Sequence, residues 1–114
     1  MAAKDLDIKI EQGKNFKLTV TVREYGVVKN LTGFEGRMQI RSSPGGALHA
    51  SLTNVEITIP APVNGQVVIN IPAATTGAYT WRLGVYDLEV FNTGTGEVIG
   101  VLKGFASLDA EVTV

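Results

Sequence analysis

Residues 75–97 read TTGAYTWRLGVYDLEVFNTGTGE, and this stretch decides the interpretation of the whole chain. From Trp81 onward apolar and polar residues alternate, which is the period expected of a strand with one buried face. The apolar positions then change from odd to even numbers. A single inserted residue exchanges the two faces of a strand, so the change predicts a β-bulge or bend, with Gly84 as a suitable site. The odd set is Trp81, Leu83 and Val85, and the even set is Tyr86, Leu88 and Val90.

The residues before this strand have the order of a tyrosine corner in immunoglobulin-like sandwiches. Gly77 precedes Tyr79 by two positions, and Trp81 follows it by two. In such a corner the ring packs under a crossing loop while the hydroxyl bonds a backbone group upstream. The alternative is that Tyr79 is a surface aromatic on a strand. Trp81 is on the inward side of the alternation in either case, so we predict that Tyr79, Trp81, Leu83 and Gly84 are structural residues.

A period of two dominates the rest of the chain, and no helical period of useful length appears. Gly, Pro, Asn and Ser cluster between the alternating runs, as they do in turns. We predict one domain over residues 1–114, an all-β, antiparallel, immunoglobulin-like β-sandwich of about seven to nine strands. The expected strands fall near residues 6–10, 16–22, 34–40, 48–52, 55–59, 67–71, 78–91, 97–108 and 110–114, with one helical turn at 72–76.

Charge and cysteine content exclude several classes of function. Ten basic and eleven acidic residues give a net charge of −1, with no basic run that would indicate nucleic-acid binding. The absence of cysteine removes disulfides and thiolate zinc sites, and it favours synthesis in a reducing compartment such as a host cytoplasm. No apolar stretch approaches the roughly 20 residues that span a bilayer, so we expect no membrane association and no export signal.

Asp87 and Glu89 are the strongest candidates for catalysis. Residues two apart on a strand share a face, and glycosidases use carboxylate pairs across a cleft. Such a pair also needs surroundings that separate the two pKa values, and the neighbouring residues in the sequence do not indicate such surroundings. We therefore predict solvated or interface charges here, and no enzyme.

Other site chemistry is weaker still. His49 is the one histidine, and a triad of His49 and Ser51 with an Asp lacks the GxSxG elbow. Asp5 and Asp7 lack the further oxygen ligands of a calcium loop. We expect no cofactor and no metal. An aromatic platform that stacks on a glycan, built from Trp81 with the tyrosines Tyr25 and Tyr86, stays an alternative.

Four stretches carry the overall pattern of the chain: DLDIKIEQGKNFKLTVTV (5–22), NLTGFEGRMQIRSS (30–43), GQVVINIPAATTGAYTW (65–81) and VYDLEVFNTGTGEVIGVLKGFASLDAEVTV (85–114). Together they resemble small tailed-bacteriophage virion proteins. This family is similar to immunoglobulin-like modules of capsid decoration and to the N-terminal sandwich of baseplate upper proteins. The resemblance implies a non-enzymatic building block, present in many copies, and an ordered strand over 109–114.

From this resemblance we expect a capsid decoration or cementing protein that binds the virion shell in many copies. Its partners would be the major capsid protein or tail and baseplate subunits, with a homo-oligomer or multicopy assembly. The alternatives are a tail or baseplate adaptor that anchors a fibre, and a carbohydrate-binding module for host attachment. The residues expected to make contacts are Asp87, Glu89 and the loop residues Ser43, Pro44, Gly45, Thr93 and Gly94.

Overall fold

The structure is a computed structural model that describes residues 3–113. Within these residues the chain forms eleven strands, one short α-helix, α1 (Ala73–Gly77), and one 3-10 turn, η1 (Pro62–Asn64). No helix of the described part has the length and hydropathy needed to cross a bilayer. The strands are β1 (Lys4–Asp5), β2 (Ile8–Glu11), β3 (Phe16–Thr21), β4 (Arg23–Glu24), β5 (Val27–Val28), β6 (Glu35–Arg41), β7 (Leu48–Leu52), β8 (Ile57–Thr58), β9 (Gln66–Ile71), β10 (Leu83–Asn92) and β11 (Glu97–Asp109).

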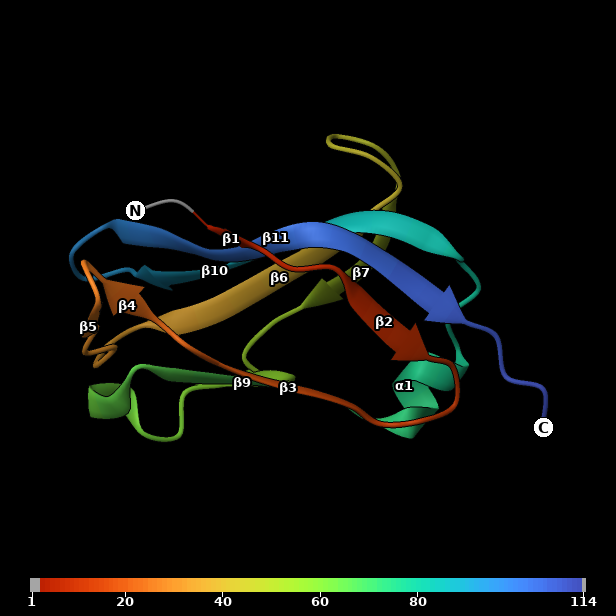
Figure 1. The fold of residues 1–114 in the computed structure, drawn as a ribbon, viewed down its shortest axis with the longest axis horizontal. Coiled ribbons are helices and arrows are strands. Elements are labelled where there is room, and N and C mark those ends of the chain that lie inside the picture. The colour runs from red at the N-terminus through yellow and green to blue at the C-terminus, as the bar shows by residue number, and fades with distance from the viewer. Residues whose placement is uncertain (1–2, 114) are drawn as a thin grey trace.

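Two sheets face each other across an apolar core, which confirms the predicted all-β sandwich (Figure 1). The larger sheet has the order β1-β11-β10-β6-β7, with β2 also paired to β11, and the smaller sheet has the order β3-β9-β8. A separate hairpin joins β4 to β5. Both β1 and β2 run parallel to β11. The larger sheet is therefore mixed, and the expectation of purely antiparallel pairing is wrong at this edge.

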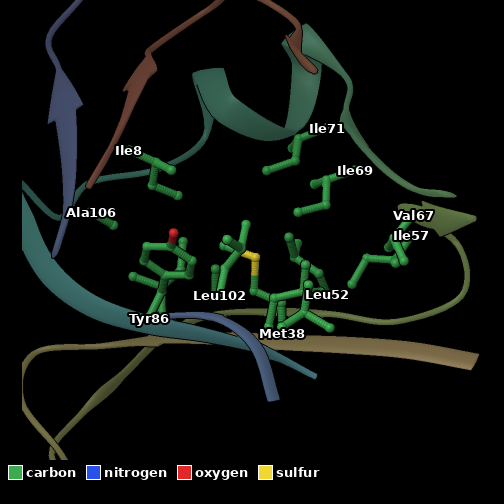
Figure 2. Packing of buried hydrophobic residues seen from close by; sticks show 14 of the residues in the cluster. Ile8, Met38, Leu52, Ile57, Val67, Ile69, Ile71, Tyr86, Leu102 and Ala106 are labelled. Carbon is green, nitrogen blue, oxygen red and sulfur yellow. The ribbon is translucent and has the colours of Figure 1, made fainter. Parts of the chain in front are cut away.

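The core is built from the inward faces of both sheets. On β9, Val67, Ile69 and Ile71 are fully buried, and Figure 2 shows Ile69 and Ile71 on the opposite side of the core from Met38 and Leu102. The two sheets pack closely at Gly36 of β6 and Ile57 of β8. A Cβ atom at this position would overlap the side chain of Ile57, so glycine allows this contact between the sheets.

The change of face lies in β11, whereas the sequence pattern placed it in β10. The pairing of β10 with β6 runs without a shift from Val85 to Phe91. Across the other edge, Leu88 pairs with Leu102 and Glu89 with Gly100, which leaves Val101 as the extra residue of a bulge. Val101 and Leu102 are both buried, as expected where a strand exchanges its faces.

Leu83 is 64% exposed, so its predicted place in the core is wrong. The inward set of β10 begins at Gly84 and continues on even numbers, so no bulge occurs at this glycine. Gly84 is buried because the neighbouring backbone approaches it. A Cβ atom there would lie 2.6 Å from the carbonyl oxygen of Arg41 and 3.0 Å from Cδ2 of His49.

Trp81 lies in the core, although it precedes β10. His49 stacks on its indole ring, with the ring centroids 5.3 Å apart and the planes within 3° of parallel. His49 reaches this position from a second bulge, because Ile40 pairs with Ala50 and Arg41 with Leu48. The histidine therefore has a packing role.

Tyr79 is half-buried beside Trp81, with the ring centroids 5.5 Å apart. Within residues 3–113 its hydroxyl forms no hydrogen bond with the backbone, so the bond of a tyrosine corner is not made. The segment is held instead through its carbonyl, which accepts a hydrogen bond of 2.8 Å from Nε2 of Gln12.

The tyrosine that ties distant segments together is Tyr86, whose hydroxyl donates a hydrogen bond to the carbonyl of Leu6. Figure 2 shows this hydroxyl pointing toward the side of the core where Ile8 lies. The bond links β10 to the segment between β1 and β2.

The predicted C-terminal strand is wrong for residues 110–113, which lie outside the strands. The last pair of the sheet is Asp109 with Glu11, after which the partner segment turns away. Val112 is 95% exposed, and Val114 lies outside the described residues.

The environment of Tyr86 predicts loss of stability in alkaline solution. Burial raises the pKa of Tyr86 to about 12, and the charge of Asp7 adds to this rise. A tyrosine in an unfolded chain ionises near pH 10, roughly. As the pH rises, Tyr86 therefore loses its proton at a lower pH in the unfolded state than in the folded state. The stabilisation that the protonated Tyr86 contributes is fully present below about pH 10 and is lost as the pH rises toward about 12. Chemical denaturation between these pH values should show the free energy of unfolding falling.

Tyr86→Phe supplies the control. The variant should show a shallower fall, because one of the responsible groups has been removed. A residual fall is expected, since burial also raises the pKa of Tyr79 and the hydrogen bond with Glu24 raises that of Lys29. Identical pH dependence in the variant and the unaltered protein would contradict the assignment to Tyr86.

Candidate interaction surface

The outer face of the larger sheet, which points away from the core, carries a row of polar residues in register across five strands. Asp87 of β10 pairs with Lys103 of β11 on one side and with Gln39 of β6 on the other. The row continues to Asp5 of β1 and to Ser51 of β7. Because these residues are paired across strands, all five side chains point to the same face.

A second row on this face is largely apolar. Val85 of β10 pairs with Phe105 of β11 and with Arg41 of β6, which pairs in turn with Leu48 of β7. Phe105 is 59% exposed, and Leu48 and Leu83 are also largely exposed. The outer face thus joins exposed apolar groups to a charged row, a combination typical of protein contact surfaces.

Residues of both rows line an open groove of about 660 Å³, called here the outer groove, whereas Ser51 and Leu48 of β7 lie outside it. The loop between β6 and β7 forms one wall, and β11 with the N-terminal segment forms the other. The predicted contact residues Ser43, Pro44, Gly45, Asp87 and Glu89 all line this groove. Thr93 and Gly94 do not, because they lie in the turn between β10 and β11. The residues that complete it are Ala3, Asp5, Gln39, Arg41, Val85, Tyr86, Leu88, Gly100, Leu102, Lys103, Gly104 and Phe105.

The charges of the groove differ in their partners. Glu89 forms an ion pair with Arg37, whose guanidinium carbon lies 4.4 Å from the ring centre of Phe91. Within residues 3–113, neither Asp87 nor Lys103 forms an ion pair, although the two are opposite each other in the sheet. Asp87 and Lys103 therefore keep their charges available to a partner.

The catalytic alternative finds little support in this arrangement. Asp87 is exposed, and Glu89 is held by a guanidinium group. An acid and base pair depends on surroundings that separate two pKa values, usually through burial. Within the described residues no group of three His, Asp or Glu side chains is arranged to hold a metal ion. The two carboxylates have the features of charges on a solvated sheet face.

The three aromatic residues considered for a glycan platform do not lie on one surface. Trp81 and Tyr86 are buried, whereas Tyr25 is fully exposed at the tip of the β4–β5 hairpin. A stacking platform needs exposed rings side by side, so these three residues do not form one.

Comparison with known proteins shows a likeness in fold. No family model matches the chain, and no curated protein matches it. Among solved structures, the N-terminal domain of phage TP901-1 ORF48 is similar, with a TM-score of 0.58 and 9% sequence identity. The match covers 96% of this chain and 99% of that one. The two chains share a fold.

Sequence reasoning missed the apolar part of the groove. Phe105 shares its parity with Ser107 and Asp109, which are not core residues, and this signal indicates an outward position. The alternation was harder to follow because the bulge at Val101 changes the inward parity earlier in β11. Val85 and Leu83 were assigned to the inward face because the sequence pattern placed the bulge in β10, at Gly84, rather than in β11.

Proposed function

We propose that this protein is a non-enzymatic structural subunit of a tailed-phage virion, present in many copies. The observation that carries the proposal is the likeness to a phage protein domain over 96% of the chain. The resemblance of the sequence to small virion proteins supports the same assignment. Its partners are other virion proteins, and its location is the virion.

Within that role we favour a tail or baseplate adaptor over the capsid decoration protein expected from the sequence. The similar solved structure is described as an N-terminal domain, so the same sandwich serves as one part of a longer phage protein. A sandwich that is joined to further protein in that phage chain supports a module that connects two parts of a virion, as an adaptor does. The outer groove is the surface with which the subunit contacts its neighbour, because it combines exposed apolar side chains with unpaired charges of both signs.

Two measurements on purified phage particles test the assignment. Quantitative mass spectrometry should find the protein in the particles, and cryo-electron microscopy should locate its copies on the tail or baseplate. Copies distributed over the capsid would restore the decoration assignment. Absence from the particles would overturn the structural role altogether.

Replacing Phe105 with serine tests the outer groove. Phe105 is more than half exposed, so the change should alter the free energy of unfolding by less than about 1 kcal/mol. Loss of its apolar surface should reduce the number of copies per particle at least about tenfold, since aromatic residues dominate contact energies. Copy number is measured by mass spectrometry of purified particles.

Val55→Ser is the matched control, because Val55 is 80% exposed and does not line the groove. It should leave the copy number unchanged. Equal incorporation of the Phe105 and Val55 variants would exclude the outer groove as the docking surface, while the virion role would stand.

A further inference from the structure

The tip of the β4–β5 hairpin has an unusual residue in its two-residue turn. Tyr25 and Gly26 have φ values of 53° and 80°, the pattern of a type I′ turn. This turn favours Asn-Gly, because both positions require positive φ and a bulky side chain is strained there. Tyr25 is nevertheless fully exposed, so its ring gains no packing within the domain that offsets the strain. The stability of the domain does not explain a tyrosine at this position.

The hairpin is held rigidly at its base. The amide of Val22 donates a hydrogen bond of 2.8 Å to the carbonyl of Gly65, and the amide of Lys29 donates one of 2.9 Å to the carbonyl of Val22. Nζ of Lys29 lies 3.3 Å from a carboxylate oxygen of Glu24 and 3.4 Å from one of Glu97. A side chain presented on such a base loses little further freedom on binding, which favours affinity.

The chemistry around Tyr25 fits a protein pocket. Val27 follows in the same hairpin and is 68% exposed, and Arg23 on the other side of the turn is exposed as well. Lys29 is paired with both Glu24 and Glu97, so Glu24 is satisfied, whereas Arg23 forms no ion pair within the described residues. A single aromatic ring offers no second ring for stacking on a sugar. An exposed tyrosine with an apolar neighbour and an arginine that forms no ion pair is typical of a protein contact, because Tyr and Arg are enriched among the residues that dominate such contacts.

We propose that Tyr25 inserts into an apolar pocket of a second virion subunit, distinct from the one at the outer groove. The hairpin is tied to Glu97 at the start of β11, whereas the groove is lined by Phe105 of the same strand. Phe105 lies eight residues beyond Glu97, roughly 26 Å along the strand. None of the hairpin residues 23–28 lines the groove, so the two surfaces are separate. Figure 1 shows β4 and β5 at the end of the sandwich beside the β10–β11 turn, which carries Thr93 and Gly94. The domain therefore bridges two neighbours, and this inference rests on the proposed virion role.

Tyr25→Asn provides a test in which stability and assembly change in opposite directions. Asparagine tolerates positive φ, so the purified variant should melt about 2–5 °C higher than the unaltered protein. In phage carrying the substitution, the number of copies per particle should fall at least about tenfold, because the ring is lost. The measurements are thermal unfolding of the purified protein and mass spectrometry of purified particles.

Two further variants act as controls. Tyr25→Phe keeps the ring and the strained turn, so it should retain both the melting temperature and the copy number. Val55→Asn removes an exposed apolar side chain from a different loop, and it should leave the copy number unchanged.

The outcomes separate this inference from the one on which it rests. Normal incorporation of Tyr25→Asn beside unaltered protein in the particles would overturn the hairpin contact alone. Normal incorporation with loss of host adsorption would replace the subunit pocket with a host ligand. A lower melting temperature in Tyr25→Asn would contradict the strained turn and remove the argument for the contact. If the unaltered protein is absent from particles, the virion role and the contact both fail.

Discussion

Replacing Trp81 with alanine should destabilise the domain by about 3–5 kcal/mol, the usual cost of deleting a buried aromatic side chain. The indole is packed between Tyr79 and the parallel ring of His49. Its removal would leave a cavity at the end of the sandwich where the bulge of β7 meets the segment before β10. Urea denaturation measures the effect, and a loss below about 1 kcal/mol would contradict the structural role of this residue.

The variant Trp81→Phe distinguishes the contribution of the aromatic ring from that of the indole nitrogen. Within residues 3–113 the indole nitrogen is buried without a hydrogen-bond partner, which is an unfavourable state for a polar group. Phenylalanine keeps part of the stacked ring and removes that nitrogen. We therefore expect a loss below about 2 kcal/mol, clearly smaller than for alanine.

Gly104→Ala should destabilise the domain by about 1–3 kcal/mol, the range found for overpacked positions. A Cβ atom there would overlap the carbonyl group of Leu6, and a backbone group cannot move aside as a side chain can. The segment between β1 and β2 would have to shift. That shift would weaken the hydrogen bond of 2.8 Å from the amide of Leu6 to the carbonyl of Lys103, and the bond from the hydroxyl of Tyr86.

Gly100→Ala is the matched control in the same strand. A Cβ atom at Gly100 would lie 3.4 Å from Cβ of Ala3, which is an ordinary contact. This variant should be neutral or slightly more stable, because alanine restricts the unfolded chain. Hydrogen exchange should show faster exchange in residues 4–11 of the Gly104 variant only. Equal stability of the two variants would show that the N-terminal segment is not held as described.

The sequence predicted the fold class well because alternation is a local signal. The run Val67, Ile69 and Ile71 was assigned to a buried strand, and all three residues are fully buried. The parallel pairing of β2 with β11 was not predicted, because no local pattern records which distant strand becomes a neighbour. The bulge was assigned to Gly84 instead of Val101 because a bulge can lie in either of two paired strands, and the pattern of one strand does not identify which.

The candidate surface was predicted in part for similar reasons. The loop residues Ser43 to Gly45 and the carboxylates Asp87 and Glu89 were chosen separately, and the sheet brings them to one groove. Phe105 was missed because its exposure depends on the bulge of its own strand. Tyr25 was considered only as a platform residue, since neither its positive φ nor its isolation is visible in the sequence.

The pairing of β2 with β11 also has a consequence for biogenesis. Ile8 is paired with Ala106 and Ile10 with Leu108, so the contacts that close the larger sheet join residues almost a full chain apart. Such non-local contacts slow folding, because a long loop must be ordered before they form. During synthesis, β2 cannot form its pairs until β11 has left the exit tunnel of the ribosome. Until then the unpaired backbone edge of β2 can pair with other nascent chains. Rapid completion of translation therefore limits misfolding and aggregation.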